Sequence, residues 1–258
     1  MKSKATWQAL AIALLCMTGA QAAEPEKANV VRDYTDSVAP ADQQAYEAGI
    51  KRYNECLGQH GFKYGWRAWI HETGDTYMYS YVTDPLAWGS FDDMRATGKV
   101  CDPSISKDIN PHLRSETSAF LVMLPELSYM PDQAMMKSDF IEVTFFKLKP
   151  SHAAFEAFRA AAQKIAAASA KTHWSSHYSV GEVREGGQDA PDFIIVSPSN
   201  SWADLEKEDS PPLWTMVENV YGKEAAQAMR KALNDAIVDQ SSHVDRYDAD
   251  LTYVPPKQ

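Results

Sequence analysis

The chain contains two related halves, and this internal repeat constrains its fold more than any other feature. Residues 127–131 (Leu-Ser-Tyr-Met-Pro) resemble residues 251–255 (Leu-Thr-Tyr-Val-Pro), which follow 124 positions later. The pairs Gly98-Lys99 and Gly222-Lys223 are separated by the same 124 positions. A repeated pattern indicates one structural unit used more than once. The sequence therefore predicts two tandem units of roughly 110 to 120 residues each.

A tryptophan motif also recurs in both halves. Trp88 is followed three positions later by Phe91 and then an acid, and Trp202 is followed in the same way by Leu205 and an acid. The two tryptophans are only 114 positions apart, because the second half carries about ten extra residues after its tryptophan. Since the motif recurs symmetrically, we expect both tryptophans to have a packing role.

The first 22 residues have the pattern of a secretory signal peptide. A basic start precedes the apolar run Ala9–Met17, which is too short to span a bilayer, and small residues follow it. We predict cleavage after Ala22 and a periplasmic or secreted protein; a buried N-terminal helix is the alternative. Cys16 does not read as a lipoprotein cysteine, because bulky Leu15 precedes it.

The acidic charge of the chain limits its partners. The formal net charge is −10, and signal cleavage would remove two lysines and no acid, giving −12. Such a charge repels phosphate backbones and anionic lipid, so we expect no nucleic-acid or membrane-surface partner. No later stretch approaches twenty apolar residues, so no membrane span is expected. A small-molecule ligand remains open.

Two cysteines, Cys56 and Cys101, remain after signal cleavage. An oxidising compartment would let them form a disulfide, which would stabilise the fold by about 4 kcal/mol through chain entropy. Two inert buried thiols are the alternative. No pair of histidines or cysteines stands at ligand spacing near them, so the sequence predicts no metal site.

The second unit, residues 138–258, shows its secondary structure most clearly. Its segments rich in β-branched and aromatic residues predict strands, and its apolar positions at helical spacing, preceded by Ser151 or by prolines, predict helices. The order is strand, helix, two strands, helix, strand. The strands are expected at 140–148, 174–184, 192–197 and 243–253. The first helix is expected at 151–170, and the second helical region in two pieces, one that starts at Ser210-Pro211-Pro212 and one at 223–239.

The first unit, residues 23–131, fits the same order less regularly. A tight turn at Thr73-Gly74 predicts a hairpin whose paired residue numbers sum to 147. Pro103 and Pro111 predict a short or irregular second helix. The remaining expectations are strands at 30–38, 63–72, 76–83 and 119–129, a helix from Pro40 to Gly58, and a linker at 132–137.

This β-α-β-β-α-β order is the ferredoxin-like arrangement. Its strands do not alternate apolar with polar residues: residues 140–148 place apolar side chains on both faces, and residues 193–196 are apolar throughout. Both faces therefore need burial. We predict an α+β fold in which two tandem ferredoxin-like units pack sheet to sheet as one intramolecular α+β barrel, a pseudo-dimeric monomer.

In its element order, two-sided strands and tryptophan motif, the sequence resembles the dimeric α+β barrel superfamily. That superfamily includes antibiotic-biosynthesis monooxygenases, stress-responsive A/B-barrel proteins and haem-degrading monooxygenases. Where most relatives pair two chains, this chain would pair its own halves. The resemblance implies small-molecule binding or oxygenase-type chemistry. The Asn, Trp and His that haem-degrading relatives use together are not matched here, so we expect no cofactor.

The first hairpin supplies the candidate ligand-binding residues. One face of its first strand carries Arg67, Trp69 and His71. An aromatic plate beside an imidazole and a guanidinium could hold an anionic or quinone-like ligand. A strand end with solvated Arg and His is the alternative interpretation.

The second unit offers His177 as a candidate general base and Tyr178 as a ligand-binding residue. A structural histidine is the alternative for His177. His173 lies four residues before His177 and, on a strand, would lie roughly 13 Å from it, which argues against a shared metal.

Two functions follow. The first is an exported protein that binds a small apolar or aromatic molecule in a cavity between sheet and helices. Such a protein could also catalyse a cofactor-independent, monooxygenase-like reaction, with His71 and His177 as the catalytic residues. The second is a non-catalytic structural or protein-interaction module with a fully packed barrel. An enclosed cavity with His and Arg at its wall favours the first function, and a dry, packed interior favours the second.

Overall fold

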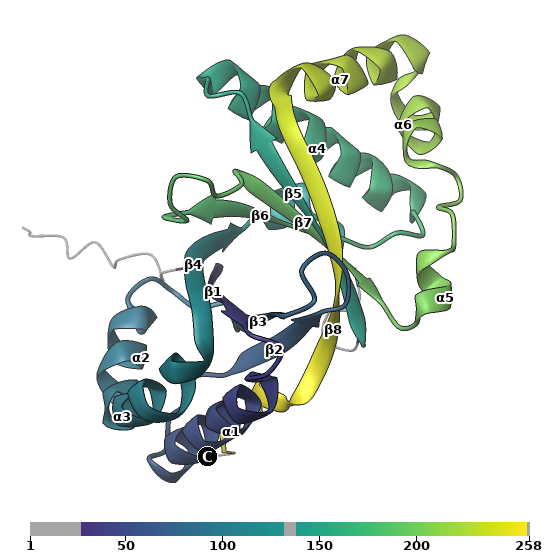
Figure 1. Cartoon of the computed structure of the whole chain (residues 1–258). Coiled ribbons are helices and arrows are strands. Elements are labelled where there is room, and N and C mark those ends of the chain that lie inside the picture. The colour runs from purple at the N-terminus through teal and green to yellow at the C-terminus, as the bar shows by residue number, and fades with distance from the viewer. Residues whose placement is uncertain (1–26, 132–137, 257–258) are drawn as a thin grey trace, which may run out of the picture.

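The computed structural model describes residues 27–131 and 138–256. The predicted signal peptide and the predicted linker at 132–137 lie outside these residues. The chain forms a closed barrel of eight antiparallel strands, with helices on two opposite outer sides (Figure 1). No helix in the part that the structure describes is both long and apolar enough to cross a membrane.

The first half follows the predicted order, with an irregular second helical segment. Pro103 and Pro111 lie in a run of short 3-10, α and π turns, as proline predicts. The last strand begins six residues before the predicted Ala119 and ends at Met123, because a 3-10 turn starts at Pro125. The elements are β1 (Val30–Val38), α1 (Gln43–Gln59), β2 (Trp66–His71), β3 (Met78–Thr83), α2 (Ser90–Gly98), α3 (Asp102–Ser104) and β4 (Leu113–Met123).

The second half also follows the predicted order. Ser151 caps the first helix as expected, because its hydroxyl accepts a hydrogen bond from the Ala154 amide at 3.2 Å. The elements are β5 (Phe140–Leu148), α4 (His152–Thr172), β6 (Ser179–Arg184), β7 (Phe193–Ser199), α5 (Trp202–Leu205), α6 (Leu213–Tyr221), α7 (Lys223–Ala236) and β8 (Ile237–Tyr253).

Three predicted boundaries in the second half are wrong by three to six residues. Residues 174–178 are not part of a strand, since β6 begins only at Ser179. The helix predicted to reach Asp239 ends at Ala236, and β8 begins at Ile237 instead of His243. Ile237 pairs with Leu148 at the end of β5, so sheet pairing overrides the helical spacing at this point.

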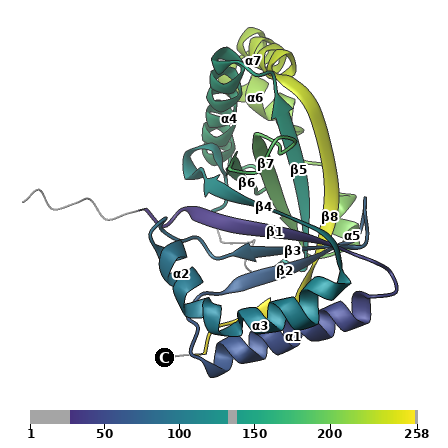
Figure 2. The ribbon, with the colours of Figure 1, turned by 60° about the vertical axis from the view of Figure 1, so that its left-hand side comes forward.

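The two halves are joined edge to edge. Around the barrel the strands run β1-β3-β2-β8-β5-β7-β6-β4, so each half orders its own strands fourth, first, third, second. The last strand of each half pairs with the second strand of the other, β8 with β2 and β4 with β6. In Figure 2, α1 and α3 cover the sheet of the first half, whereas α4, α6 and α7 cover the sheet of the second.

The repeated pentapeptides cross between the halves. Leu127 packs in the core of the second half, and Leu251 packs in the core of the first. In both places the following hydroxyl accepts a backbone hydrogen bond from the other half. Val180 donates to Ser128 at 2.9 Å, and Ala68 donates to Thr252 at 3.0 Å.

The β2–β3 hairpin has a longer connection than the two-residue turn predicted for it. Ala68 pairs with Tyr81, so paired residue numbers sum to 149 instead of 147. The chain does not turn at once after β2, because the Glu72 amide donates a hydrogen bond to the Val244 carbonyl of β8 at 2.8 Å. A slip of two residues keeps every side chain on its predicted face.

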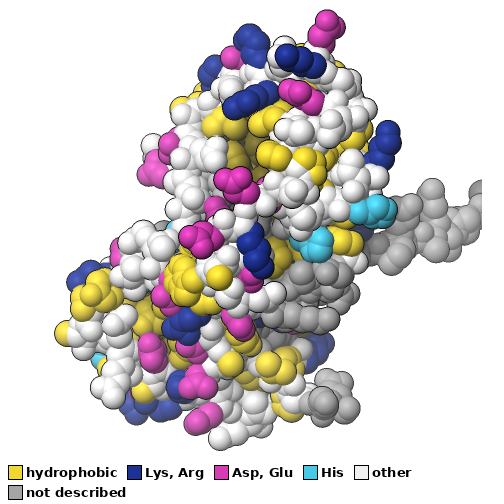
Figure 3. All heavy atoms as spheres, turned by 90° about the vertical axis from the view of Figure 1, so that its right-hand side faces the viewer, with side chains coloured by type: hydrophobic (Ala, Val, Ile, Leu, Met, Phe, Trp, Pro, Cys, Tyr) yellow, Lys and Arg dark blue, Asp and Glu magenta, His cyan; other side chains and the backbone are white. Residues whose placement is uncertain are grey.

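Alternate residues of each strand face either the helices or the barrel interior. On β2, Ala68 packs with Tyr46 of α1, whereas Trp69 packs with Ile141 and Val143 of β5, the strand beyond β8 in the barrel. The face of β2 that carries Trp69 therefore lines the interior. Figure 3 shows the side of the molecule with β8 and α5, where hydrophobic side chains form separate patches divided by charged ones.

Candidate functional site

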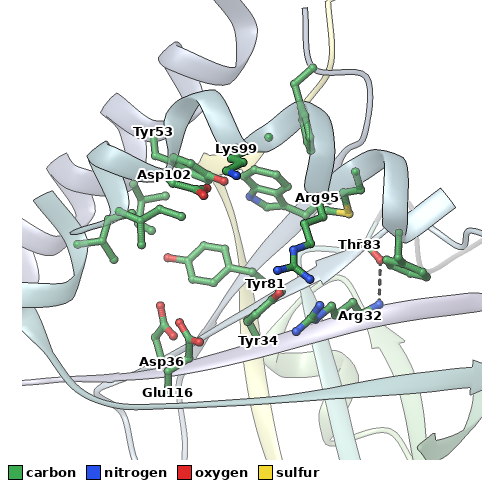
Figure 4. A pocket seen from close by; sticks show the side chains of 18 of the residues that line it. Arg32, Tyr34, Asp36, Tyr53, Tyr81, Thr83, Arg95, Lys99, Asp102 and Glu116 are labelled. Carbon is green, nitrogen blue, oxygen red and sulfur yellow. Dashed lines mark hydrogen bonds between the residues drawn. The ribbon is translucent and has the colours of Figure 1, made fainter. Parts of the chain in front are cut away.

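A cavity lies between the sheet of the first half and the helices that cover it (Figure 4). Its volume is about 810 Å³. Ligand pockets of roughly 300 to 1,000 Å³ enclose small molecules of drug size. The wall is formed by β1, β3, β4 and the start of β2 on one side and by α1, α2 and the turns after α2 on the other. The cavity can therefore hold one small organic molecule.

Aromatic side chains form much of the wall. The period of two along β1 places Arg32, Tyr34 and Asp36 on the helix-facing side of the strand, and all three line the cavity. Trp66 of β2 stacks on Tyr53 of α1 with ring centroids 6.0 Å apart and planes 19° apart. Flat aromatic surfaces of this kind favour a planar ligand.

One end of the cavity carries positive charge. The Arg32 guanidinium lies 4.5 Å from the ring centroid of Tyr34 and 4.9 Å from that of Phe120. Its Nε has no hydrogen-bond partner, although it is buried. Arg95 reaches it from the helical side, and Figure 4 shows the Arg32 and Arg95 guanidinium groups close together, whereas Lys99 lies beside Asp102.

These cations are not neutralised by the protein. Among residues 27–131 and 138–256, no carboxylate lies within ion-pair distance of Arg32, Arg95 or Lys99. In a chain with a formal net charge of −10, two neighbouring arginines that have no ion-pair partner among the described residues indicate a site for an anion. Guanidinium groups bind carboxylate, sulfonate or phosphate groups through parallel hydrogen bonds, so this end of the cavity suits an anion.

The opposite end carries an acidic pair. Asp36 and Glu116 face each other across β1 and β4. Burial raises the pKa of Asp36 to about 7, an effect that the hydrogen bond from Tyr46 opposes and the nearby Glu116 reinforces. Tyr46 donates to Asp36 Oδ2 at 2.6 Å, whereas Oδ1 has no partner. The Tyr46 hydroxyl also lies 2.9 Å from that of Tyr81, so a hydrogen-bonded chain connects Asp36 to the cavity wall.

This raised pKa predicts a stability difference that depends on pH. Asp36 has a higher pKa in the folded chain, about 7, than its ordinary value of 3.8, so its ionisation destabilises the fold as pH rises from about 4 to 7. We expect Asp36→Asn to increase the free energy of unfolding by about 2 kcal/mol at pH 8.5, with no gain near pH 4. Urea unfolding of both proteins at the two pH values measures this. An equal difference at both values would contradict the raised pKa.

Comparison with known proteins identifies the type of fold. No family model and no curated protein matches the sequence. A candidate monooxygenase from Lactobacillus acidophilus superposes with a TM-score of 0.52 at 11% identity, over 85% of this chain and 94% of that one. An anthrone oxidase-like protein gives 0.52 at 12% identity over 86% and 92%, and a chlorite dismutase variant from Candidatus Nitrospira defluvii gives 0.51 at 10% identity over 87% and 93%. This chain has the dimeric α+β barrel fold.

In this α+β barrel, the residues predicted for ligand binding on β2 lie together but not at the cavity. Trp69 is buried in the barrel interior with its ring centroid 5.6 Å from that of Tyr247, and the Arg67 guanidinium lies 5.4 Å from the same ring. His71 is 5% exposed, and its Nε2 is 3.1 Å from the Ser80 hydroxyl. All three belong to the face of β2 that points away from α1.

The predicted residues of the second half lie elsewhere again. His177 and Tyr178 precede β6 in an irregular segment, and the His177 ring lies 5.6 Å from that of Tyr129. Burial raises the pKa of Tyr178 to about 12. His173 ends α4 in the left-handed backbone conformation, so it is not on a strand as predicted. The α+β barrel therefore does not bring His177 to the face that carries His71.

Both repeated tryptophans pack against a phenylalanine at the outside of the barrel. Trp88 has its ring centroid 4.9 Å from that of Phe120, and Trp202 has its ring centroid 4.9 Å from that of Phe140. They are 45% and 51% exposed, so each covers the edge of a core without being enclosed in it. Phe120 also lines the cavity, so Trp88 supports the wall beside Arg32.

Cys56 of α1 and Cys101, which follows α2, are joined by a disulfide bond. The bond ties the irregular turns after α2 to the end of α1. Lys99 and Asp102 of those turns line the cavity, so the disulfide fastens one side of its wall. Of the two alternatives that the sequence left open, the structure contains the crosslink.

The resemblance to haem-degrading monooxygenases raises the question of haem in this cavity. Haem iron is usually held by His, Cys thiolate, Met or Tyr phenolate. No histidine or cysteine is among the described residues that line the cavity. Burial raises the pKa of the lining tyrosines Tyr34, Tyr53 and Tyr81, which opposes the phenolate form, and Met94 alone is a weak ligand. The donor set of the cavity does not fit a haem iron.

The sequence reasoning missed Arg32, Asp36 and Arg95. The signal that could have found the first two is the alternation Arg-x-Tyr-x-Asp along β1, which places a cation, an aromatic ring and an acid on one face of a strand. Arg95 lies on α2 and has no comparable signal, because only the packing of α2 over the sheet brings it to Arg32.

Proposed function

We propose that this chain binds a small planar aromatic molecule with an anionic group in the cavity of its first half. The observation that carries the proposal is the division of one 810 Å³ cavity into a cationic end, an aromatic middle and an acidic end. The anionic group would lie between Arg32 and Arg95, and the ring would lie against Tyr34 and Trp66. Asp36 would then face the far edge of the ligand.

In this proposal Asp36 acts as the general base of the site. A general base works best when its pKa lies near the ambient pH, and burial brings the pKa of Asp36 to about 7. Its free Oδ1 can take a proton from an acidic O–H or C–H of the bound ligand. Tyr46 would stabilise the carboxylate through the hydrogen bond that it donates to Oδ2.

Proton removal of this kind supports a cofactor-independent oxygenation. A carbanion conjugated with an aromatic ring can react with dioxygen directly, so that a ring CH₂ becomes C=O and the second oxygen atom leaves as water. The structural similarity to proteins described as a candidate monooxygenase and as anthrone oxidase-like supports this class of reaction. In this proposal Asp36, not His71 or His177, is the base.

Export and duplication complete the proposal. We propose that the chain is secreted after cleavage behind Ala22, that its halves descend from one duplicated ferredoxin-like unit, and that it acts as a pseudo-dimeric monomer. The matching hydrogen bonds of Ser128 and Thr252 support the duplication. The N-terminal residue and the mass of the protein purified from its host test export and oligomeric state.

Removing the charges at the cationic end of the cavity should weaken the binding of an anionic ligand more than that of an uncharged one. We expect Arg32→Gln/Arg95→Gln to weaken binding of 2-naphthoate by about 10- to 100-fold, because it removes charge-assisted hydrogen bonds. Binding of the uncharged 2-naphthalenemethanol should change less than about twofold, since the aromatic wall remains. Isothermal titration and quenching of tryptophan fluorescence measure both ligands, because Trp66 lies in the wall.

Arg230→Gln provides the matched control, because Arg230 lies over Trp214 in the second half, away from the cavity. Equal losses for the charged and the uncharged ligand would contradict the assignment of Arg32 and Arg95 to an anion. If no aromatic probe binds the wild-type protein, the alternative function, a non-catalytic structural or interaction module, gains support. The 810 Å³ cavity favours binding over that alternative.

A further inference from the structure

Three side chains with metal-binding atoms meet inside the barrel, at the seam where β2 of the first half pairs with β8 of the second. They are His71 on β2 and His243 and Asp245 on β8. His243 Nε2 lies 3.1 Å from Asp245 Oδ1, and His71 Nε2 lies 3.7 Å from the same oxygen. The potential ligand atoms of all three residues lie within 4.8 Å of one another.

The backbone holds this cluster in place. His71 is directly opposite Asp245 in the β2–β8 pairing, and His243 shares a strand face with Asp245 because it lies two residues away. The two imidazole rings stack with centroids 4.1 Å apart and planes 27° apart. The side chains of His71 and Asp245 are only 6% and 3% exposed, whereas that of His243 is 16% exposed, so solvent reaches the cluster from the His243 side.

One carboxylate oxygen of the cluster has no hydrogen-bond donor, although the other, Asp245 Oδ2, lies 3.2 Å from His243 Nε2. Asp245 Oδ1 is buried and accepts no hydrogen bond within the described part of the chain. The same is true of the buried Oδ1 of Asp33 on β1. Leaving a buried carboxylate oxygen without a donor is costly, so the site favours a cation.

The histidines are suited to donate electron pairs. A neutral imidazole has one nitrogen free to bind a metal. Nε2 of both rings is the atom that lies nearest to the Asp245 carboxylate.

We propose that His71, His243 and Asp245 bind a divalent first-row transition metal ion such as Zn²⁺. Two imidazoles and one carboxylate form a common donor set for such ions, with metal–ligand distances of roughly 2.0 to 2.2 Å. Neighbouring ligand atoms then lie about 3 to 3.5 Å apart, close to the 3.1 and 3.7 Å observed. Each ring would turn about its Cβ–Cγ bond to direct its Nε2 lone pair to the ion.

The bound ion would have two structural effects. Its charge would balance the carboxylates of Asp245 and Asp33 inside the barrel. One ligand comes from the first half and two from the second, so the ion would clamp the seam between them. The site lies on the interior face of β2 and does not depend on what the helix-covered cavity binds.

A second group of metal-binding side chains does not compete with this site in the oxidised protein. Cys56, His60 and Cys101 also lie close together, but the two sulfurs are joined in a disulfide. A disulfide sulfur is not a thiolate, which is the form that binds metal ions. Titrations without a reducing agent therefore report on the barrel site.

The test is a metal titration of the full, tag-free protein after chelator treatment. We expect one equivalent of Co²⁺ to give visible d–d bands, Zn²⁺ to displace it, and Zn²⁺ to raise the melting temperature. His243→Gln should lower the Co²⁺ affinity by more than about 100-fold, more than the loss of an outer-shell partner usually costs. His60→Gln and Arg32→Gln serve as controls and should leave the affinity unchanged.

His243→Gln is the main variant because His243 is partly exposed and its replacement is tolerated best; Asp245→Asn provides a second removal of a ligand. Wild-type protein that binds Co²⁺ no more tightly than both variants would overturn the proposal, as would an affinity that depends on His60. The double variant Arg32→Gln/Arg95→Gln distinguishes this inference from the proposed function. It should lose naphthoate binding but still bind Co²⁺ like the wild-type protein.

Discussion

Phe193→Ala is expected to lower the free energy of unfolding by about 3 to 5 kcal/mol, which is typical for loss of an enclosed aromatic side chain. Phe193 of β7 is fully buried. Its ring lies between two phenylalanines of α4, 4.5 Å from Phe158 and 4.8 Å from Phe155 by ring centroids. Removal leaves a cavity that the rigid sheet and helix can close only in part. Urea unfolding followed by far-UV circular dichroism measures the change.

Phe140→Ala is the matched control, because Phe140 is half-buried and contacts Trp202 at the outside of the barrel. It should cost clearly less than Phe193→Ala, since solvent can fill the space that it leaves. Both residues belong to the second half, so neither variant should change naphthoate binding while folded. Similar costs for the two substitutions would show that Phe193 is not the centre of this core.

Replacing both Cys56 and Cys101 by alanine is expected to lower the free energy of unfolding by about 4 kcal/mol. The disulfide joins residues 45 positions apart, and releasing a loop of that length increases the entropy of the unfolded chain. The slope of the free energy against urea should rise as well, because an uncrosslinked chain exposes more surface on unfolding. Parallel unfolding of oxidised wild type, reduced wild type and the double variant tests this.

The same variant should weaken aromatic ligand binding in the first half. The disulfide holds the turns that carry Lys99 and Asp102 against α1, so its loss loosens one side of the cavity wall. Reduced wild-type protein should behave like the variant in both measurements. An unchanged unfolding midpoint would mean that the crosslink adds no stability beyond the packing of buried Cys101.

Local patterns predicted most of the elements. Residues 30–38 and 140–148 form strands with the predicted bounds, and Ser151 caps α4 as its position before an Ala-rich helix indicates. The prolines at 103 and 111 correctly predicted an irregular segment. These features depend on neighbours in sequence: backbone preference, a capping hydroxyl, or a missing amide hydrogen.

Boundaries and register were predicted less well, for a common reason. Ile237 continues a helical pattern, yet it pairs with Leu148, which lies 89 positions earlier. Glu72 was assigned to the end of a tight hairpin, yet its amide bonds to Val244 of β8. In both cases a hydrogen bond from a distant strand outweighs a local preference that is worth less than about 1 kcal/mol per residue.

The candidate sites were also predicted correctly where neighbours in sequence decide them and missed where distant segments do. The sequence correctly placed Arg67, Trp69 and His71 on one face of a strand, but which face meets the helices was open. The metal-binding cluster was missed because its ligands, His71 and His243, stand 172 positions apart and show no ligand spacing. Arg32 and Arg95 likewise approach each other only when α2 covers the sheet.

By itself, the sequence predicted the order in which each half forms strands and helices, and it indicated that both faces of the strands must be buried. Only the tertiary structure decided that β8 pairs with β2 and β4 with β6, and that the interior is polar at the β2–β8 seam. The reason is physical: periodicity and capping act over a few residues, whereas pairing edges and cavities depend on contacts between distant segments.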